Sequence, residues 1–147
     1  NKLMMQGINI IPEAEIATTV VKVKALTPIT IHSTEKNGDG DTRTYFYSPF
    51  EKEFNERINK NLRTKWEALY KDKCYSNIKI TPLFENGKDN EKCIYFGSKI
   101  EKRTFVKGWV GNFLLEGDIN LIQLAYQAGI GARNSQGFGM LDILQKK

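Results

Sequence analysis

The sequence predicts an α+β fold whose elements follow one another in the order strand, helix, strand, strand, helix, strand. Three observations carry this prediction: an alternating apolar pattern early in the chain, a helical apolar pattern after Ser48, and a long apolar strand before a second, short helix. This βαββαβ order is that of the ferredoxin-like fold, in which an antiparallel sheet carries both helices on one face. The 147 residues suffice for one domain with a hydrophobic core.

The first strand is predicted between Ile16 and Ser33, where apolar and polar residues alternate. One side of the strand is apolar and carries Val21, Val23, Ala25, Ile29 and Ile31. The other side presents Lys22, Lys24 and His32. Because Pro28 cannot donate to a β-ladder, we expect a break, a bulge or a sheet edge at that position.

Residues 34 to 44 are polar and are interpreted as a loop. Their Asp39-Gly40-Asp41 run invites a calcium-loop interpretation. However, Thr42 stands where such a loop needs glycine for its sharp turn, and Ser48 stands where it needs a bidentate glutamate. Calcium binding is therefore rejected.

The stretch Ser48-Pro49-Phe50-Glu51 is typical of a helix start, with a serine cap, a proline at the first helical position and a glutamate three residues after the cap. Apolar residues then recur at helical spacing, which predicts a helix running to about Lys71. The basic residues of this helix are interpreted as a solvated face: Arg57, Lys60, Arg63, Lys65 and Lys71.

Strand patterns return around Ile78, and Asn86-Gly87 is a turn signal. From Cys93 to Leu115 the pattern fits either one long bent ribbon or two strands broken near Gly97-Ser98 or Lys102-Arg103. The end of this segment is apolar on both faces, which predicts a central strand. A short helix over residues 119–128, capped by Asp118, and a last strand over residues 140–144 complete the chain.

Residues 129 to 139 form a glycine-rich loop, with four glycines in eleven positions. Glycine costs backbone entropy and packs nothing, so this segment is either a helix stop followed by a turn or a loop that faces a ligand. In dinucleotide and P-loop sites the glycines precede a helix, whereas here they follow one, and no GK[ST] is present. A nucleotide cofactor is therefore not expected, and an anion held here would contact the loop amides, Arg133, Asn134 and Ser135.

The composition of the chain limits the kinds of partner, metal site and membrane association that can be expected. The net charge of +5 and the pI near 9.1 favour a polyanionic partner without requiring one. Cys74 and Cys93 lack a CxxC spacing and a histidine partner, so neither zinc nor a disulfide scaffold is indicated. No apolar run has the length of a membrane span, and no signal peptide is visible. We expect a cytoplasmic protein with no metal, no cofactor and no membrane partner.

Four segments together carry a resemblance to a known family: Gly108 to Asp118, Leu121 to Tyr126, Gly129 to Gly131, and Asn134 to Met140. They resemble the C-terminal signature of the CRISPR repeat-RNA processing endoribonucleases of the RAMP superfamily. The segment Leu26 to Ile29 resembles, more weakly, the element that opens the same domain. The resemblance implies a RAMP- or RRM-like version of the ferredoxin-like fold.

It further implies a protein of two tandem ferredoxin-like domains that cuts precursor RNA within each repeat, without metal, and leaves a 2′,3′-cyclic phosphate. Residues 1–15 are then a connector from a missing N-terminal domain, and residues 16–147 are the C-terminal ferredoxin-like domain. In the family the general base is usually a histidine of the N-terminal domain. This chain alone is therefore expected to be inactive, and its partners are CRISPR repeat RNA, hairpin or single-stranded, the N-terminal domain, and as a further candidate a CRISPR effector complex.

No catalytic residue is expected in the chain itself. His32 is a candidate base but does not occupy the family's usual catalytic position. The expected RNA-binding residues are Lys22, Lys24, Arg43, Lys107, Gly129, Gly131, Arg133, Asn134, Ser135 and Gly137. Further basic candidates are Lys99, Lys102 and Arg103. Candidate platforms for unpaired bases are Tyr45, Tyr47 and Phe138, each with core or turn packing as the alternative.

Two other functions stay open. One is a noncatalytic RNA-binding subunit of the same superfamily. The other is a ferredoxin-like structural or regulatory domain that never meets RNA. The basic strand faces and Arg133 favour the two RNA-binding hypotheses over the last one.

Overall fold

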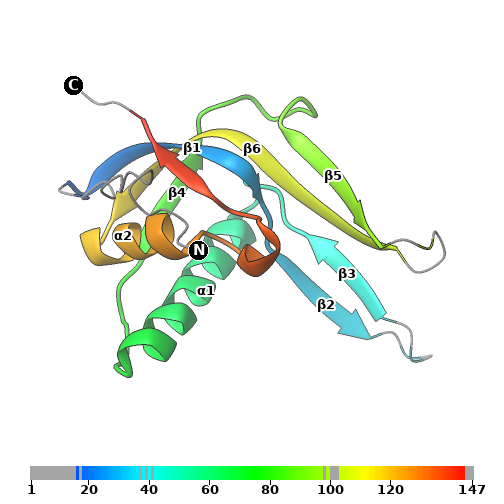
Figure 1. The fold of residues 1–147 in the computed structure, drawn as a ribbon, viewed down its shortest axis with the longest axis horizontal. Coiled ribbons are helices and arrows are strands. Elements are labelled where there is room, and N and C mark those ends of the chain that lie inside the picture. The colour runs from blue at the N-terminus through cyan, green and yellow to red at the C-terminus, as the bar shows by residue number, and fades with distance from the viewer. Residues whose placement is uncertain are drawn as a thin grey trace, which may run out of the picture.

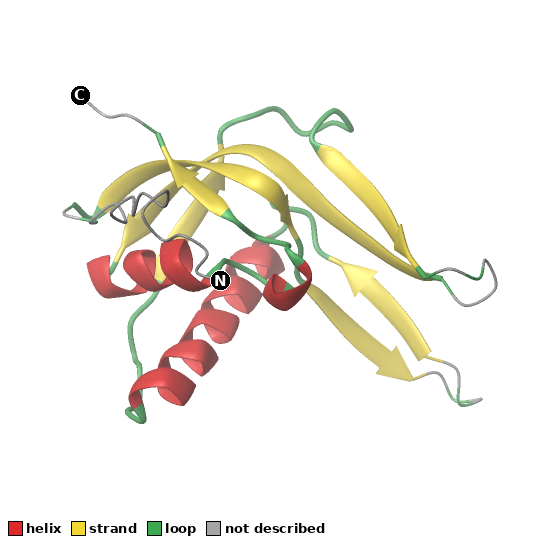
Figure 2. Ribbon diagram, in the orientation of Figure 1, coloured by secondary structure: helices red, strands yellow, loops and turns green. Residues whose placement is uncertain are grey.

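The computed structural model describes residues 16, 18–36, 38, 40, 42–97, 99 and 103–144; the expected connector at residues 1–15 and Lys102 lie outside the described residues. Figures 1 and 2 show the arrangement of the elements. In chain order these are β1 (Val20–Ile29), β2 (His32–Lys36), β3 (Thr42–Phe46), α1 (Lys52–Tyr70), β4 (Ile78–Pro82), β5 (Glu91–Phe96), β6 (Thr104–Gly117), α2 (Ile119–Ala128), the 3-10 helix η3 (Asn134–Gln136) and β7 (Leu141–Ile143).

The main sheet is antiparallel, with the strand order β4-β6-β1-β7. Strand β5 pairs with the first half of β6, on the edge that β4 occupies further along. Taken with α1 and α2, the order β1-α1-β4-β6-α2-β7 is the βαββαβ arrangement, and both helices lie on one side of the sheet (Figure 2). The predicted ferredoxin-like fold class is confirmed.

Strand β1 alternates as predicted. Val21, Val23 and Ala25 are buried under the helices, whereas Lys22 and Lys24 are exposed on the opposite face. From α1, the side chains packed onto this buried face are Phe54, Ile58 and Leu62; from α2, they are Leu121, Ile122, Leu124 and Ala125. The core therefore lies between the helices and the sheet.

The strand predicted over residues 16–33 is two strands in different sheets. Its pairing with β6 shifts register between Ala25 and Ile29, so the irregularity expected at Pro28 is present. The chain leaves the main sheet after Ile29 and begins β2 at His32.

The loop interpretation of residues 34–44 is wrong for residues 34–36 and 42–44, which lie in strands. Strands β2 and β3 pair as an antiparallel hairpin, from His32 opposite Phe46 to Lys36 opposite Thr42. Most of its residues are polar and exposed, so no alternation of apolar and polar residues marks it as a strand. An edge-to-face contact of 5.8 Å between the ring centroids of Phe46 and Phe105 joins the hairpin to β6, and Figure 1 shows the hairpin projecting beside the β5–β6 ribbon.

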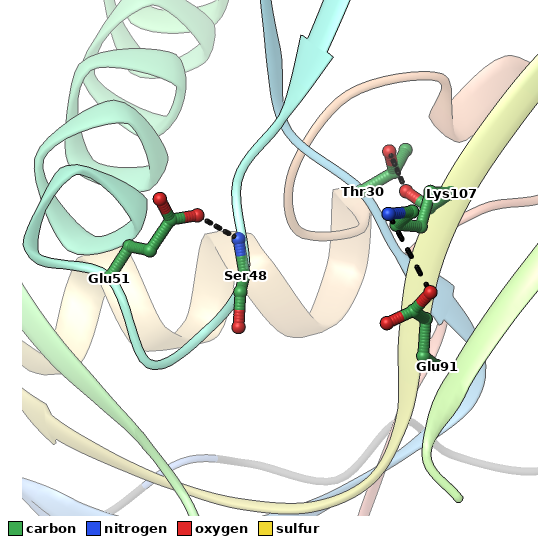
Figure 3. Close-up of polar contacts among 5 residues, drawn as sticks. All are labelled: Thr30, Ser48, Glu51, Glu91 and Lys107. Atoms are coloured by element: carbon green, nitrogen blue, oxygen red, sulfur yellow. Dashed lines mark hydrogen bonds and ion pairs between the residues drawn. The ribbon is translucent and has the colours of Figure 1, made fainter. Parts of the chain in front are cut away.

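The first helix begins at Lys52, later than the sequence signals predict. The expected capping contacts nevertheless form one turn earlier. The Ser48 amide donates to Oε1 of Glu51 at 2.6 Å (Figure 3), and the Phe50 amide donates to Oγ of Ser48 at 3.2 Å. Because these contacts stabilise a turn over residues 48–51, the capping signature is correct while the helix boundary is not.

The segment Cys93 to Leu115 resolves as two strands rather than one bent ribbon, since β5 ends at Phe96 and β6 begins at Thr104. Strand β6 is central, as expected, with β1 on one edge and β4 and β5 on the other. One of its faces is buried through Trp109, Phe113 and Leu115.

Two asparagines of α1 bind the free edge of β4. The side-chain amide of Asn59 accepts from the Ile78 amide and donates to the Ile78 carbonyl, both at 2.7 Å. Asn55 does the same at Ile80, at 3.0 and 2.8 Å. Four residues of helix rise about 6 Å and two residues of strand about 6.6 Å, so the spacings match. The edge of the sheet is thereby paired with side chains instead of being left open.

Candidate functional site

The glycine-rich loop is fastened to the end of β1. The Ala132 amide donates to the Thr30 carbonyl at 2.8 Å, and the Gly139 amide donates to the Pro28 carbonyl at 2.9 Å. Across the base of the loop, the Ile130 amide donates to the Gly139 carbonyl at 3.0 Å. These bonds make the loop a built element of the fold, between α2 and β7 in Figure 1.

Helix α2 delivers the chain into this loop as predicted. The Asp118 carboxylate caps its first turn by accepting from the amides of Asn120 and Leu121. At the other end Gly129 is the C-cap, with φ of 92° and an amide bond to the Ala125 carbonyl at 3.0 Å. A positive φ at this position suits glycine, because it has no Cβ to clash with the backbone.

Asn134 holds the inside of the loop together. Its Nδ2 donates to the carbonyls of Ile130, at 3.2 Å, and Phe138, at 2.9 Å. The preceding residue, Arg133, has φ of 62°, a left-handed conformation that costs a side-chain-bearing residue energy. Its Nη1 donates to Oε1 of Gln136 at 2.8 Å. The backbone at Arg133 is thus locally strained, and its side chain bonds back to the loop.

The three loop glycines expected to bind RNA, Gly129, Gly131 and Gly137, have structural roles in the loop. The amides of Gly129 and Gly137 donate to the carbonyls of Ala125 and Asn134, so these amides are occupied inside the protein. A Cβ on Gly131 would lie 2.5 Å from the Thr30 carbonyl oxygen. Glycine therefore shapes the loop at these positions, and direct contact with RNA there stays a prediction, as it does at exposed Ser135.

Lys65 of α1 binds the glycine-rich loop. The sequence-based interpretation of Lys65 as part of a solvated helix face is therefore wrong. Its Nζ donates to the carbonyl oxygens of Gly129, at 3.0 Å, and Gly131, at 2.9 Å. Burial lowers the pKa of the Lys65 ammonium to about 8, while the two carbonyl acceptors favour its charged form. Lys65 therefore binds two loop carbonyls instead of extending into solvent, and burial makes its charged form costly.

Replacing this ammonium tests that role. We expect Lys65→Met to lower the free energy of unfolding by about 1–2 kcal/mol, because two carbonyls lose a charged donor. In the parent chain the pKa near 8 lies below the unfolded value of about 10.4, so the free energy of unfolding should rise between these pH values. Urea titrations across that range should show the rise in the parent and in exposed Lys52→Met, and no rise in Lys65→Met.

A cationic pocket lies where α1 meets the start of β2. The residues that line it are Ile31, His32, Arg57, Lys60, Asn61 and Thr64, none of them acidic. The Arg57 guanidinium lies over the Tyr47 ring, 4.9 Å from its centroid, and the Tyr47 hydroxyl is 3.0 Å from Oγ of Ser33. Arg57 is thus held at the pocket rather than extended into solvent.

Arg133 of the glycine loop reaches the same region. Burial, then Arg133, then Arg57 lower the pKa of His32 below its usual 6.5, so both cations lie near the imidazole. Three atoms here are buried without a hydrogen-bond partner among the described residues: Nδ1 of His32, Oδ1 of Asn61 and Nε of Arg133. The site gathers positive charge and unpaired polar atoms in one place.

The other predicted basic residues do not join this site. Lys22 and Lys24 lie on the helix-free face of the sheet, and Arg43 lies on the projecting hairpin. Lys107 pairs with Glu91 at 3.6 Å, and its carbonyl accepts from Oγ1 of Thr30 at 2.7 Å (Figure 3). The ten predicted residues therefore do not form a single surface, and roles in RNA binding for these four remain predictions.

Of the three aromatic residues considered as stacking platforms for bases, two are packed within the protein and one is exposed. Phe138 is 4% exposed and packs against Phe96, and Tyr47 is half-buried beneath Arg57. Tyr45 is 49% exposed, with its hydroxyl bonded to Oε2 of Glu51 at 2.6 Å. Of the three, Tyr45 is the most exposed, although its ring also contacts Tyr47 at 4.8 Å between centroids.

Arg57, Lys60 and Asn61 were missed as site residues, although the sequence holds one signal for them. With Thr64 they stand at positions i, i+3, i+4 and i+7, which places them on one helix face. That spacing identifies a polar stripe on the helix, but it does not show which residues of the rest of the chain lie beside the stripe. The stripe meets His32 and Arg133 only through the packing of α1 against β1 and the loop.

Among the described residues, no group of three or more histidine, cysteine, aspartate or glutamate side chains is placed to hold a metal ion. Within the same part of the chain, no helix is long and apolar enough to cross a membrane.

Comparison with known proteins gives consistent matches. The family described as CRISPR associated protein Cas6, C-terminal, matches residues 11–143. The CRISPR-associated endoribonuclease Cas6 1 of Methanocaldococcus jannaschii is 31% identical over 125 residues, covering 85% of this chain and 46% of that protein. The CRISPR-associated endoribonuclease Cas6 of Pyrococcus furiosus is 28% identical over 118 residues, covering 80% and 40%.

Solved structures agree in fold. A CRISPR associated protein Cas6 has a TM-score of 0.68 at 27% identity, covering 93% of this chain and 52% of that chain. The product of a Cas6-related gene from Pyrococcus furiosus has a TM-score of 0.74 at 20% identity, with the same coverage, and supports the fold alone. The chain spans less than half the length of the two curated relatives that it matches.

Proposed function

The chain belongs to the family of the C-terminal part of the CRISPR-associated protein Cas6, and on this premise we propose that it supplies the RNA-binding half of an endoribonuclease that cuts CRISPR precursor RNA within the repeat. The family match over residues 11–143 is the observation that carries the proposal. The cationic site formed by His32, Arg57, Lys60 and Arg133 supports it, because RNA is a polyanion.

The proposed cleavage is an internal transesterification that needs no metal. A general base takes the proton of a ribose 2′-hydroxyl, and the 2′-oxygen attacks the adjacent phosphorus. The bond from phosphorus to the 5′-oxygen of the next nucleotide breaks, and a general acid protonates that leaving oxygen. The products are a 2′,3′-cyclic phosphate and a free 5′-hydroxyl. Cations near the phosphate stabilise the charge that develops on its oxygens.

In this proposal the chain binds and orients the RNA, while the base comes from the N-terminal domain of the longer protein. Arg133 is a suitable phosphate contact, since it lies on a loop anchored at both ends, its side chain is partly exposed, and a guanidinium can offer several donors to a phosphate. His32 stays a candidate proton acceptor: its lowered pKa keeps its imidazole neutral near pH 7.

Removing the Arg133 side chain tests RNA binding. We expect Arg133→Ala to weaken binding of a labelled repeat RNA roughly 5- to 30-fold, the loss of one charge-assisted contact. Lys52→Ala removes an exposed cation of α1 that pairs with Glu56 at 4.0 Å, and should leave the affinity nearly unchanged. Equal affinities for the parent and Arg133→Ala would argue against the loop as a contact site.

End-group analysis tests the chemistry. The longer protein that contains this domain should cut repeat RNA in excess EDTA and leave 5′ products with 2′,3′-cyclic phosphate ends, which resist phosphatase until a cyclic phosphodiesterase opens them. The 147-residue chain alone should bind the RNA without cutting it. Binding without cleavage by the longer protein would point to a noncatalytic RNA-binding subunit, and cleavage that depends on added Mg²⁺ would contradict the metal-independent step.

A further inference from the structure

We propose that the pocket between α1 and the start of β2 binds one backbone phosphate of the RNA, at a site separate from the glycine-loop amides. This inference rests on the proposed function in that it takes RNA as the ligand. Its elements are Arg57, Lys60, Asn61 and Thr64 from one face of α1, with His32 opposite them and Arg133 close by.

The charge of the pocket calls for an anion. The ion pairs among the described residues join Lys52 to Glu56 and Lys107 to Glu91, so none of them neutralises this pocket. Neighbouring cations repel one another, and the lowered pKa of His32 reflects that repulsion together with burial. A bound phosphate would relieve the repulsion, and Arg57 can offer it two parallel donors.

The lining selects the backbone of the nucleic acid rather than a base. No aromatic side chain other than the His32 imidazole lines the pocket, and Ile31 is its one apolar residue, so a base would find little surface on which to stack. The Arg57 guanidinium is already stacked on Tyr47, which leaves its edge for hydrogen bonds. Phosphate contacts of this kind fix the register of the RNA and carry little sequence choice.

The salt dependence of binding tests the pocket directly. The double variant Arg57→Gln with Lys60→Gln should reduce the slope of log affinity against log salt by about 0.7, the change expected when one phosphate of single-stranded RNA is no longer neutralised. The matched control, Lys52→Gln with Lys71→Gln, removes the same charge from exposed positions at the two ends of α1, the first helical residue and the C-cap, and should keep the parent slope. Equal slopes for the parent and the pocket variant would overturn the proposal.

Scanning the RNA with single methylphosphonates identifies the phosphate. Neutralising the phosphate that occupies the pocket should weaken binding to the parent and have no further effect on the pocket variant. If the methylphosphonate at every position of the RNA weakens binding to the pocket variant as much as it weakens binding to the parent, the proposal fails. Inorganic phosphate alone should compete only weakly, and saturation of the pocket by free phosphate at low concentration would assign it to a small anion instead.

The pKa of His32, measured by NMR, provides an independent test of the pocket. His32 is the single histidine of the chain, so its imidazole signal needs no separate assignment. The charged groups that face it are Arg57 and Lys60 from α1 and Arg133 from the loop. RNA in the pocket should raise the pKa of His32, so affinity should increase as the pH falls through the range between the free and bound values. A His32 pKa unchanged by bound RNA contradicts the proposal even if the pocket variant is unstable.

These results separate the two proposals. A parent chain that does not bind repeat RNA sinks the proposed function. A parent chain that binds RNA with a steep salt slope, while the pocket variant keeps that slope and RNA leaves the His32 pKa unmoved, sinks only the pocket.

Discussion

Gly139→Ala is expected to lower the free energy of unfolding by about 3–5 kcal/mol, a large part of a typical domain's stability. A Cβ at this position would lie 2.0 Å from the Ile130 carbonyl oxygen, and φ is +78°. The backbone must therefore shift. That shift disturbs the bond from the Ile130 amide to the Gly139 carbonyl and the bond from the Gly139 amide to Pro28. RNA binding should fall with it, since these bonds position Arg133.

Gly137→Ala is the matched control. Gly137 also has a positive φ, of 96°, but a Cβ there meets nothing within 4 Å. Its cost should be that of a left-handed alanine, about 1 kcal/mol. Urea denaturation of the three proteins measures both effects. If the two alanine variants are equally stable, the close approach at Gly139 is not what the loop requires.

Asn59→Ala is expected to cost about 2–5 kcal/mol. Asn59 is 8% exposed, and its amide pairs with both the N–H and the carbonyl of Ile78. Removing it leaves two backbone groups without partners, at about 1–3 kcal/mol each where water cannot replace the amide. Because the freed groups lie on a sheet edge, the variant should also aggregate more readily at high concentration.

Asn59→Asp separates hydrogen bonding from volume at this position. A carboxylate can still accept from the Ile78 amide, but it places negative charge against the Ile78 carbonyl. It should therefore be destabilising at neutral pH and less so in acid, where the protonated carboxyl can donate. Stabilities of Asn59→Ala and Asn59→Asp equal to the parent in urea would show that the edge of β4 is satisfied in another way.

Much of the fold was predictable because local patterns and global packing agree. The alternation of Val21, Lys22, Val23 and Lys24 reports which face of β1 meets the helices, and Asp118 caps α2 as its position predicts. The β2–β3 hairpin was not predicted from the sequence because most of its residues are polar and exposed. A strand without a buried face leaves no periodic signal.

The candidate site was predictable in part. The glycines and Arg133 stand out in sequence because their composition is unusual for a helix or a strand. Lys65 and Arg57 do not, since a lysine or arginine on an amphipathic helix is ordinarily solvated. Their roles arise when a loop more than sixty residues later packs beside α1, as the bonds from Lys65 to Gly129 and Gly131 show. Such tertiary contacts are invisible to spacing alone.

The most direct measurement is the affinity of the unmodified chain for a labelled CRISPR repeat RNA over a series of salt concentrations. If the pocket of Arg57 and Lys60 neutralises one phosphate and Arg133 neutralises a second, log affinity should fall against log salt with a slope of about −1.4 or steeper, at roughly 0.7 per neutralised phosphate. No binding at low salt, or an affinity that does not change with salt, would contradict the proposal that this domain is the RNA-binding half of an endoribonuclease.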